Sequence, residues 1–550
     1  MKLQSISTTT AIQASLPKHD LKGQSLAVIG LGKSGLAAVR LALARGASVL
    51  AIDQNENLDP FERNPLFEKH NNVKTILGHF DNNLLKDVDT VVVSPGVPPE
   101  AYSLSSLLQL VVTSELDFAA EVLPVCTKIL AVTGTNGKST VATFAGQMLN
   151  HLDIKTFVGG NLGIPLSEVA LQCLESTPES PVFEASSALL AFYSPSHYIG
   201  TVISIVTDFV VEVSSYQLEI AHKYFSPSVA VILNLTPDHL ERHMTMENYA
   251  LTKCRILSHM SNSKMGILPL GNQHLNDAVR SSANDFNLAW IGAFPGVRIN
   301  LEAKVASFRI PAVQGFSELQ LSALKTIGTH NYHNAAVAAL SVIGLDIGID
   351  AEAISSTIGK LKVPPHRMEI VHTDNHGVIW VDDSKATNIE ATCTGLMGLK
   401  GQKSVILLGG VAKVLRTSLS LVFWVAVTLE FLNFKKVEWT LNYNTALVIR
   451  SVNSHTQIAL ASWILHSLGR EYLIRQGSSG FERLLEHLIC HRGIVTFGYS
   501  GMMIQKTLST NGLSIPCIRA TNLEDAVKQA RSMTTSGNLA NAFMTTVGQY

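Results

Sequence analysis

The chain has 550 residues, of which 46% are hydrophobic and 15% are charged, and its net charge at pH 7 is -1. This length predicts roughly three or four domains of about 150 residues each. A net charge so close to zero gives no electrostatic reason to expect a nucleic acid or an anionic membrane as a partner. The six cysteines show no C-x-x-C spacing, so we expect reduced thiols and no zinc site held by thiolates.

The first segment, 1–20, is rich in Ser and Thr and has no acidic residue before Asp20. It lacks the apolar region of a secretory signal, so we expect a disordered tail or an organelle transit peptide. The longest apolar stretch, 419–434, contains Glu430 and is shorter than the roughly 20 residues that a membrane helix needs. We therefore expect no membrane span.

Segment 21–125 predicts a Rossmann-like domain. An apolar strand at 25–29 runs into GLGKSG at 30–35 and then into a helix rich in Ala and Leu. The next strand ends at Asp53, which in a dinucleotide-binding domain would hold a ribose hydroxyl. A third strand leads into SPGVP at 94–98, a rigid turn at the edge where α/β sheets bind ligands. The domain is suited to a nucleotide or a nucleotide-sugar.

Segment 126–361 predicts a central ATP-binding domain with a phosphate loop. An apolar strand at 129–132 feeds GTNGKST at 134–140, and a helix follows. Glycines let the backbone N–H groups turn toward an anion, Lys138 can reach the outer phosphates, and the Ser139 hydroxyl can bind Mg²⁺.

Further along this domain, polar residues follow apolar strands. Glu212 lies in VEVSSYQLE, and His239 follows Asp238 in NLTPDHLERH. Carboxylates and histidines at such strand ends, beside a phosphate loop, are suited to Mg²⁺. Lys253 lies on the next predicted helix and would bring a cation toward the same place, and THNYHN at 329–334 precedes an Ala-rich helix.

Segment 362–550 predicts a second doubly wound α/β domain, because strands again alternate with helices. It opens near His366-Arg367. One strand then runs into DDSKATN at 382–388, another into GGVAK at 409–413, and a third, at 493–497, into GYSG and a helix.

These blocks, in this order, resemble the Mur ligase family of peptidoglycan biosynthesis. The resemblance covers most of 21–413 and resumes over 477–533. It implies an α/β chain of three domains: an N-terminal Rossmann-like domain, a central P-loop ATPase domain and a C-terminal Rossmann-like domain. The first domain is most similar to that of the D-glutamate-adding ligases. The last stretch is similar to plant or algal members, which would make the compartment the plastid stroma rather than the bacterial cytoplasm.

The resemblance also implies an activity. An ATP-dependent amide ligase of this type joins D-glutamate to UDP-N-acetylmuramoyl-L-alanine through an acyl phosphate, with ATP and Mg²⁺ as cofactors. We expect a monomer that takes small molecules as its only substrates.

Site residues carried over from the family fall into three groups. The catalytic and metal-binding group is Lys138, Ser139, Glu212, His239 and Lys253, in which Lys253 matches a lysine that is carbamoylated in the family. The ATP-binding group is Gly134, Thr135, Asn136, Gly137, Lys138, Ser139, Thr140, Asn334, Arg367 and Asp383. The substrate-binding group is Ser34, Pro95, Gly96 and Asn161 for the UDP-sugar, and Lys385, Thr387 and Lys413 for D-glutamate.

Three stretches depart from the family pattern. Segments at about 184–210 and about 414–476 carry no family motif, so we interpret them as inserted translated sequence. Segment 537–550 lacks the Ser-Pro-Gly type of turn that completes the D-glutamate pocket in the family.

Other hypotheses remain open. A nucleotide-binding homologue that has lost catalysis would account for the departures, and another Mur or folylpolyglutamate-type ligase would share the motifs. A NAD-linked oxidoreductase would account for 30–53, but it leaves 134–140 and 383–388 without a role.

Overall fold

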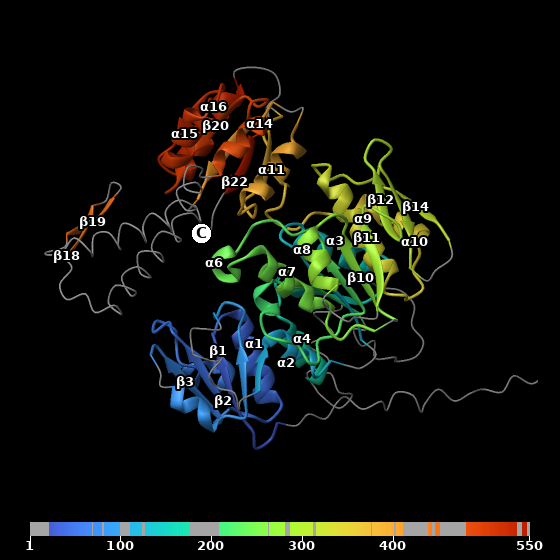
Figure 1. Cartoon of the computed structure of the whole chain (residues 1–550), viewed down its shortest axis with the longest axis vertical. Helices are drawn as coiled ribbons and strands as arrows, with labels where there is room; N and C mark the ends of the chain where they lie inside the picture. The colour runs from blue at the N-terminus through green and yellow to red at the C-terminus, as the bar shows by residue number, and fades with distance from the viewer. Residues whose placement is uncertain are drawn as a thin grey trace, which may run out of the picture. The chain divides into compact units, whose positions relative to one another are not determined.

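The computed structural model describes residues 21–68, 70–79, 82–98, 111–123, 127–161, 163–175, 208–261, 263–280, 286–311, 315–375, 377–400, 403–410, 438–442, 446–450, 480–535 and 542–546. The chain forms two compact units, which divide between Pro364 and Pro365. The first unit holds two sheets, and the second holds a six-stranded sheet and a separate pair of strands (Figure 1). The predicted α/β architecture, with Rossmann-like sheets before and after a phosphate-loop sheet, is confirmed. The predicted domain boundaries stay predictions.

The first sheet is fully parallel, with the order β3-β2-β1-β4-β5. Its strands are β1 Ser25–Ile29, β2 Ser48–Asp53, β3 Val73–Leu77, β4 Thr90–Val93 and β5 Val111–Ser114. Helix α1 (Lys33–Ala44) follows β1, and α2 (Glu115–Ala120) follows β5. The apolar runs predicted to be buried strands are buried. Because β1 pairs parallel with β4, the carboxyl ends of these strands lie side by side and bring the two predicted substrate turns together.

The central sheet has nine strands in the order β14-β13-β12-β11-β10-β9-β6-β8-β7. They are β6 Lys128–Thr133, β7 Thr156–Gly160, β8 Asp208–Glu212, β9 Val229–Ile232, β10 Met265–Pro269, β11 Asn287–Ile291, β12 Gly296–Asn300, β13 Val305–Arg309 and β14 Ser317–Gln320. The helices are α3 Lys138–His151, α4 Leu166–Glu175, α6 Leu240–His243, α7 Met246–Cys254, α8 Gln273–Arg280, α9 His330–Ile343 and α10 Ala351–Ser355. The strands from β7 across to β12 are parallel, and β13 and β14 extend the sheet antiparallel. The ends of β6, β8 and β9 therefore meet at one edge, where the polar motifs lie.

Three apolar cores hold this unit together, and the smallest lies on the first sheet around Ile29 and Val91. One of the two larger cores joins α1 and α2 of the first sheet to α4 and to one face of the central sheet. The other packs α3 and α9 on the opposite face. The small side chains of α9, which include Ala335, Ala336, Ala338 and Ala339, are buried there, and they let the two helices approach closely. The start of α3 is thereby fixed against the start of α9.

Strand β8 corrects the boundary of the first predicted insert. Asp208, Phe209 and Val210 belong to this strand, pair with β6 on one side and β7 on the other, and are buried. The remainder of that insert, 184–207, lies outside the described residues.

The second unit contains a six-stranded sheet in the order β15-β16-β22-β17-β20-β21. Its strands are β15 Glu369–Thr373, β16 Ile379–Asp383, β17 Val405–Gly409, β20 Gly493–Thr496, β21 Cys517–Arg519 and β22 Ala542–Thr546. Its helices are α11 Ile389–Gly398, α14 Leu485–Leu488, α15 Gly501–Thr510 and α16 Leu523–Thr535. Strand β22 pairs parallel with β16 and β17, so segment 537–550, which we expected to depart from the family, still contains a central strand. Residues 547–550, where the Ser-Pro-Gly type of turn would follow in the family, lie outside the described residues.

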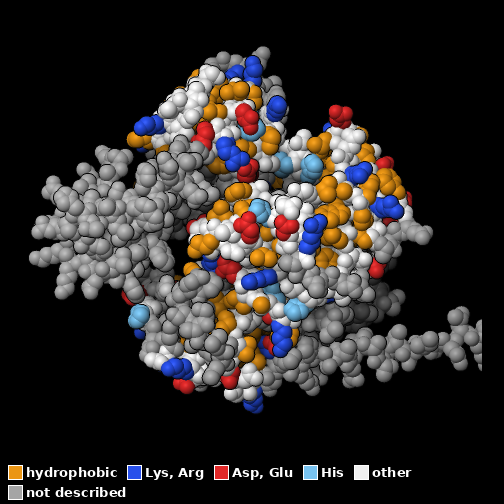
Figure 2. All heavy atoms as spheres, in the orientation of Figure 1, with side chains coloured by type: hydrophobic (Ala, Val, Ile, Leu, Met, Phe, Trp, Pro, Cys, Tyr) orange, Lys and Arg blue, Asp and Glu red, His pale blue; other side chains and the backbone are white. Residues whose placement is uncertain are grey.

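Two strands fall within the second predicted insert. They are β18 (Glu438–Asn442) and β19 (Ala446–Arg450), which form a separate antiparallel pair. The apolar stretch 419–434 is outside the described residues. Within the described residues, no helix is long and apolar enough to cross a membrane. The described cysteines, Cys173, Cys254, Cys393, Cys490 and Cys517, are all unpaired, as predicted. On the face in view, acidic and basic side chains are interspersed (Figure 2).

Candidate functional site

The phosphate loop lies between β6 and α3, and its shape requires glycine at two positions. Gly134 has a φ of 148° and Gly137 a φ of 86°. A Cβ on Gly134 would lie 3.0 Å from the Cβ of Leu233, and one on Gly137 would lie 3.1 Å from Oδ1 of Asn334. The loop is therefore packed against β9 and the first turns of α9, with Ser139 and Thr140 buried at the start of α3.

Asn234, which follows β9, holds the loop in this shape. Its Oδ1 accepts the N–H groups of Thr135 at 3.0 Å and Asn136 at 2.9 Å, and its Nδ2 donates to the carbonyl of Asn136 at 3.0 Å. The Thr135 hydroxyl adds a bond to the carbonyl of Thr236 at 3.2 Å. We did not predict a role for Asn234, although its place directly after a buried strand was a usable signal.

Two lysines converge on one carbonyl of the loop. Lys138 Nζ donates to the Gly134 carbonyl at 3.0 Å and to that of Thr135 at 2.9 Å, and Lys253 Nζ donates to the Gly134 carbonyl at 3.0 Å. Lys253 is 1% exposed and lies 4.5 Å from the centre of the Tyr249 ring. Burial, reinforced by the positive charge of Lys138, holds the pKa of Lys253 well below its usual value. Its amine is therefore disposed to be neutral.

Glu212 is the last residue of β8 and is buried beside the loop. Its Oε1 accepts a hydrogen bond from Asn161 Nδ2 at 3.0 Å, and the Asn161 N–H donates to its carbonyl at 2.8 Å. Its Oε2 is buried and has no hydrogen-bond partner among the described residues. A buried carboxylate oxygen of this kind is costly unless a cation or a donor completes it. This oxygen and the Ser139 hydroxyl are both hard donors of the kind that Mg²⁺ prefers.

His239 precedes α6 in a left-handed conformation, with a φ of 53°. Its Nδ1 lies 2.7 Å from the Tyr216 hydroxyl, and the two rings meet edge to face with centres 4.9 Å apart. Its Nε2 lies 3.7 Å from Asp238 Oδ2 and is the ring nitrogen that remains for a metal ion. The neighbouring His243 is buried, and burial lowers its pKa to about 4, so it is neutral at pH 7.

Of the four predicted UDP-sugar residues, Ser34, Pro95 and Gly96 lie at the end of the first sheet, whereas Asn161 follows β7 of the central sheet. Ser34 is in the first turn of α1, and the Ser94 hydroxyl, just before Pro95 and Gly96, donates to the Gly30 carbonyl at 2.6 Å. Asp53, the acid of the dinucleotide-type motif, accepts the N–H of Leu31 at 2.6 Å. It therefore closes the glycine turn of its own sheet.

In the second unit, Arg367 and Asp383 form one local cluster. Left-handed residues, His366 with a φ of 64° and Met368 with a φ of 50°, flank Arg367. Its Nη1 donates to the Lys385 carbonyl at 2.6 Å, and Asp383 Oδ1 accepts the N–H of Met368 at 3.1 Å. Burial raises the pKa of Asp383 to about 7, against the opposing charge of Arg367.

Two of the residues predicted to bind D-glutamate lie just beyond this cluster. Lys385 and Thr387 are joined by a backbone hydrogen bond of 3.0 Å, whereas Lys413 lies outside the described residues. The Asn388 side chain then caps α11 through the N–H of Ala391 at 2.8 Å.

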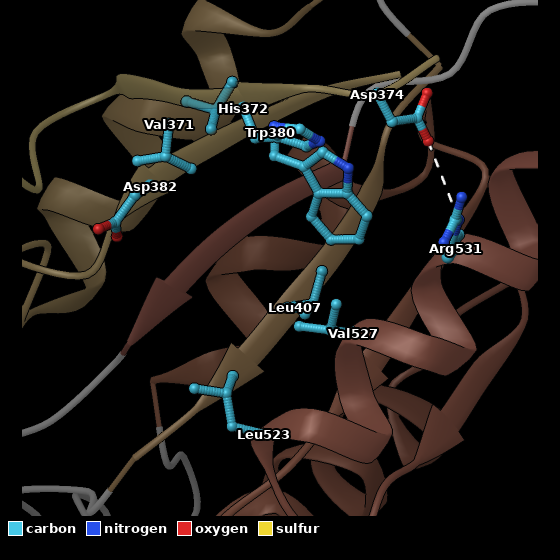
Figure 3. A pocket seen from close by; sticks show the side chains of 10 residues that line it. Val371, His372, Asp374, Trp380, Asp382, Leu407, Leu523, Val527 and Arg531 are labelled. Atoms are coloured by element: carbon cyan, nitrogen blue, oxygen red, sulfur yellow. Dashed lines mark ion pairs between the residues drawn. The ribbon is translucent and has the colours of Figure 1, made fainter. Parts of the chain in front are cut away.

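A cavity of about 450 Å³ lies on the same sheet, beneath α16 (Figure 3). Trp380 lies at its centre, with the Asp374–Arg531 ion pair, at 3.9 Å, on one side. Its lining is Val371, His372, Asp374, Trp380, Val381, Asp382, Leu407, Leu523, Val527 and Arg531. It contains none of the predicted site residues.

A strand, a glycine loop with a lysine at the start of a helix, and a buried carboxylate on the neighbouring strand define a nucleotide-phosphate-binding α/β protein. Comparisons with known proteins narrow this class. Residues 24–113 match the family described as Mur ligase MurD-like, N-terminal domain, and residues 132–342 match the Mur ligase middle domain. The chain belongs to the Mur ligase family, as predicted.

Two individual relatives illustrate the similarity, and both carry the same enzyme name. The chain is 34% identical over 400 residues to the UDP-N-acetylmuramoylalanine–D-glutamate ligase of Lachnospira eligens, covering 71% of this chain and 78% of that one. It is 32% identical over 403 residues to the ligase of the same name from Thermoanaerobacter pseudethanolicus, covering 72% and 79%. Among solved structures, MurF from Acinetobacter baumannii has a TM-score of 0.50 at 16% identity, covering 96% of this chain and 89% of that one. That similarity shows the fold.

Proposed function

We propose that the chain uses ATP to join D-glutamate to UDP-N-acetylmuramoyl-L-alanine. The observation that carries this proposal is the phosphate loop with Lys138 beside the buried, half-satisfied carboxylate of Glu212. Relatives named for this reaction, at up to 34% identity over most of their length, support the choice of substrates.

The reaction proceeds in two transfers. A carboxylate oxygen of the alanyl group attacks the γ-phosphorus of ATP, and ADP leaves with the electrons of the broken P–O bond. The D-glutamate amine then attacks the acyl carbon, loses a proton and expels phosphate. The first transfer demands charge neutralisation and in-line placement, which Lys138 and the loop N–H groups are placed to supply.

Ser139, Glu212 and His239 would hold Mg²⁺, which when bound neutralises charge on the phosphates. Asn161 donates a hydrogen bond to Glu212, so a UDP-sugar held by Asn161 would lie beside this carboxylate. Asn334 packs against Gly137 of the phosphate loop and would contact the nucleotide. Arg367 and Asp383 would complete nucleotide binding, and Lys385, Thr387 and Lys413 would receive the D-glutamate carboxylates.

Lys253 carries a further part of the proposal. A neutral buried amine can add CO₂, forming an N–C bond and releasing a proton, and the lowered pKa of Lys253 favours that addition. The carbamate would turn this cation into an anion that can orient a second Mg²⁺. Monomeric state and a plastid address for 1–20 likewise remain proposals.

Phosphate release tests the function. The chain is incubated with ATP, Mg²⁺ and UDP-N-acetylmuramoyl-L-alanine, and each of a panel of amino acids is added in turn. We expect release that depends on both the UDP-sugar and D-glutamate. Release with another amino acid would move the chain to a different Mur-type ligase. Nucleotide binding without release would identify a homologue that has lost catalysis.

A further inference from the structure

Arg242 on α6 connects the turn of the first sheet to the central sheet. Its Nη2 donates to the Val97 carbonyl at 2.9 Å, and its Nε donates to Glu219 Oε2 at 3.0 Å. Its guanidinium carbon lies 4.2 Å from the centre of the Tyr216 ring. One side chain therefore touches the Val97 turn, an acidic residue and an aromatic ring at the same time.

Tyr216 continues this connection to His239. The Tyr216 hydroxyl lies 2.7 Å from His239 Nδ1, and the edge-to-face contact of the two rings fixes the plane of the imidazole. A partner on one ring nitrogen fixes the direction in which the other nitrogen points. The contacts thus run from Val97 through Arg242 and Tyr216 to His239.

These contacts are sheltered from solvent. The side chains of Arg242 and Glu219 are only 14% and 12% exposed. A paired guanidinium held by two acceptors, with a ring beneath it, has far less freedom than an ion pair on the surface. A shift of the Val97 carbonyl must therefore move Arg242 or break its bonds.

We propose that Arg242 is a positioning residue that couples binding of the UDP-sugar at the 94–97 turn to the orientation of His239 toward the metal ion. This inference rests on the proposed function, which places the UDP-sugar on Pro95 and Gly96 and Mg²⁺ on His239. A ligand that orders the turn fixes the Val97 carbonyl, and Arg242 and Tyr216 then hold the imidazole in one orientation. Because coupling is reciprocal, the metal ion should tighten UDP-sugar binding by the same factor.

The test measures metal affinity rather than turnover. Mn²⁺ replaces Mg²⁺, and its affinity is measured by electron paramagnetic resonance with ADP present, with and without UDP-N-acetylmuramoyl-L-alanine. In the wild-type chain we expect the UDP-sugar to raise Mn²⁺ affinity by about fivefold or more, within the usual range of coupling. In Arg242→Lys, which keeps the charge but cannot reach both acceptors, the factor should fall to about one.

Two further variants keep the inference falsifiable. Tyr216→Phe keeps the ring and removes only the hydroxyl, so it should also lose the coupling and weaken Mn²⁺ binding by roughly tenfold. Arg40→Lys is the matched control, because Arg40 bonds Glu168 at 2.6 Å and joins α1 to α4 away from His239. It should keep the wild-type factor.

Different outcomes would contradict the inference about Arg242 and the proposed function. Full coupling in Arg242→Lys, or a wild-type chain that binds both ligands without coupling, overturns the inference and leaves the proposed function standing. A wild-type chain that does not bind the UDP-sugar overturns the proposed function, and the inference with it.

Discussion

The phosphate loop and the Arg367–Asp383 cluster, both of which we propose to bind the nucleotide, are built in different ways. The loop connects β6 directly to α3, and one side chain, Asn234, fixes its backbone through three hydrogen bonds. The Arg367–Asp383 cluster is assembled from a turn and a strand end, around non-glycine residues in left-handed conformations. Its sheet needs β22, which is far along the chain, as a central strand.

The difference shows which parts of the structure are determined by residues that are close together in the sequence. A strand, a glycine turn and a helix in succession determine the loop almost alone. The second cluster depends on strands brought together from distant segments. We therefore expect substitutions in the loop to act on chemistry, and changes in the second unit to act first on stability.

The largest effect should come from Lys138→Ala. Losing this charge leaves the phosphates held by backbone N–H groups, so turnover should fall by roughly 10³-fold or more and ATP binding should weaken. Phosphate release and nucleotide titration measure the two effects. Lys155→Ala, at an exposed position after α3, is the control and should behave as wild type. Undiminished turnover in Lys138→Ala would remove the assignment of the phosphate loop.

Lys253→Ala should reduce turnover by about 10²-fold, within the range for one preorganised charged group. If the lysine is carbamoylated, added formate or acetate should partly restore activity by replacing the missing anion. Methylamine is the matched additive, because the Lys253 amine donates to the Gly134 carbonyl. Rescue by methylamine and not by carboxylates would mean that the unmodified amine is the working form.

Asn234→Ala tests whether the loop is held as rigidly as its contacts indicate. The change removes the side-chain partner of the Thr135 and Asn136 N–H groups and of the Asn136 carbonyl, and the Thr135 N–H keeps only its bond to the backbone carbonyl of residue 234 at 3.1 Å. We expect a loss of about 1–3 kcal/mol in stability and a roughly tenfold weaker affinity for ATP. Asn234→Asp keeps the acceptor and loses the donor, so it should fall between. An unchanged affinity for ATP in the Ala variant would show that the loop is shaped by its glycines alone.

Much of the fold could be predicted from sequence, and the reasons are local. β6, α3 and α1 follow from apolar runs and glycine turns, and β4 is observed at the predicted residues. The start of β8 was missed because the apolar pairs Val182-Phe183 and Val210-Val211 each precede a glutamate, and only pairing with β6 and β7 identifies the residues that form the strand. Tyr216 and Arg242 were missed because no spacing along the chain reveals that their side chains meet. The role of β22 was missed because the sequence does not specify between which strands a late segment will insert.

Removing the two predicted inserts should have a smaller effect, and that effect should be on stability. We expect a chain without 184–207 and 414–476 to melt several degrees above the full chain, about 2–4 °C per kcal/mol. Removing 184–210 instead would put Val182 where Phe209, 1% exposed and 5.9 Å from the Phe157 ring, packs in β8. That variant should melt lower than the 184–207 deletion, because the Phe209 site loses its ring while Phe183 takes the place of the smaller, buried Val210. Equal melting of the full chain and the shorter deletion would mean that the inserted segments are tolerated structure.

The smallest effect concerns the pH dependence of Asp383. Its folded pKa is raised from 3.8 to about 7 by burial, so its contribution to stability is complete below pH 3.8 and is lost as the pH rises through 7. Asp383→Asn resembles the protonated side chain and keeps an acceptor for the Met368 N–H. Measured without nucleotide, the melting temperature of wild type should therefore fall relative to this variant as the pH rises from roughly 5 to 8. Asp525→Asn is the matched control in the same unit, because hydrogen bonds from Thr521 lower the pKa of Asp525 below 3.8. Its stabilising effect is lost only as the pH falls through that lowered value, so its difference from wild type should stay constant over the same range. A constant difference for Asp383→Asn as well would show that Asp383 is ionised in the folded chain, which would make its cluster as well satisfied as the phosphate loop.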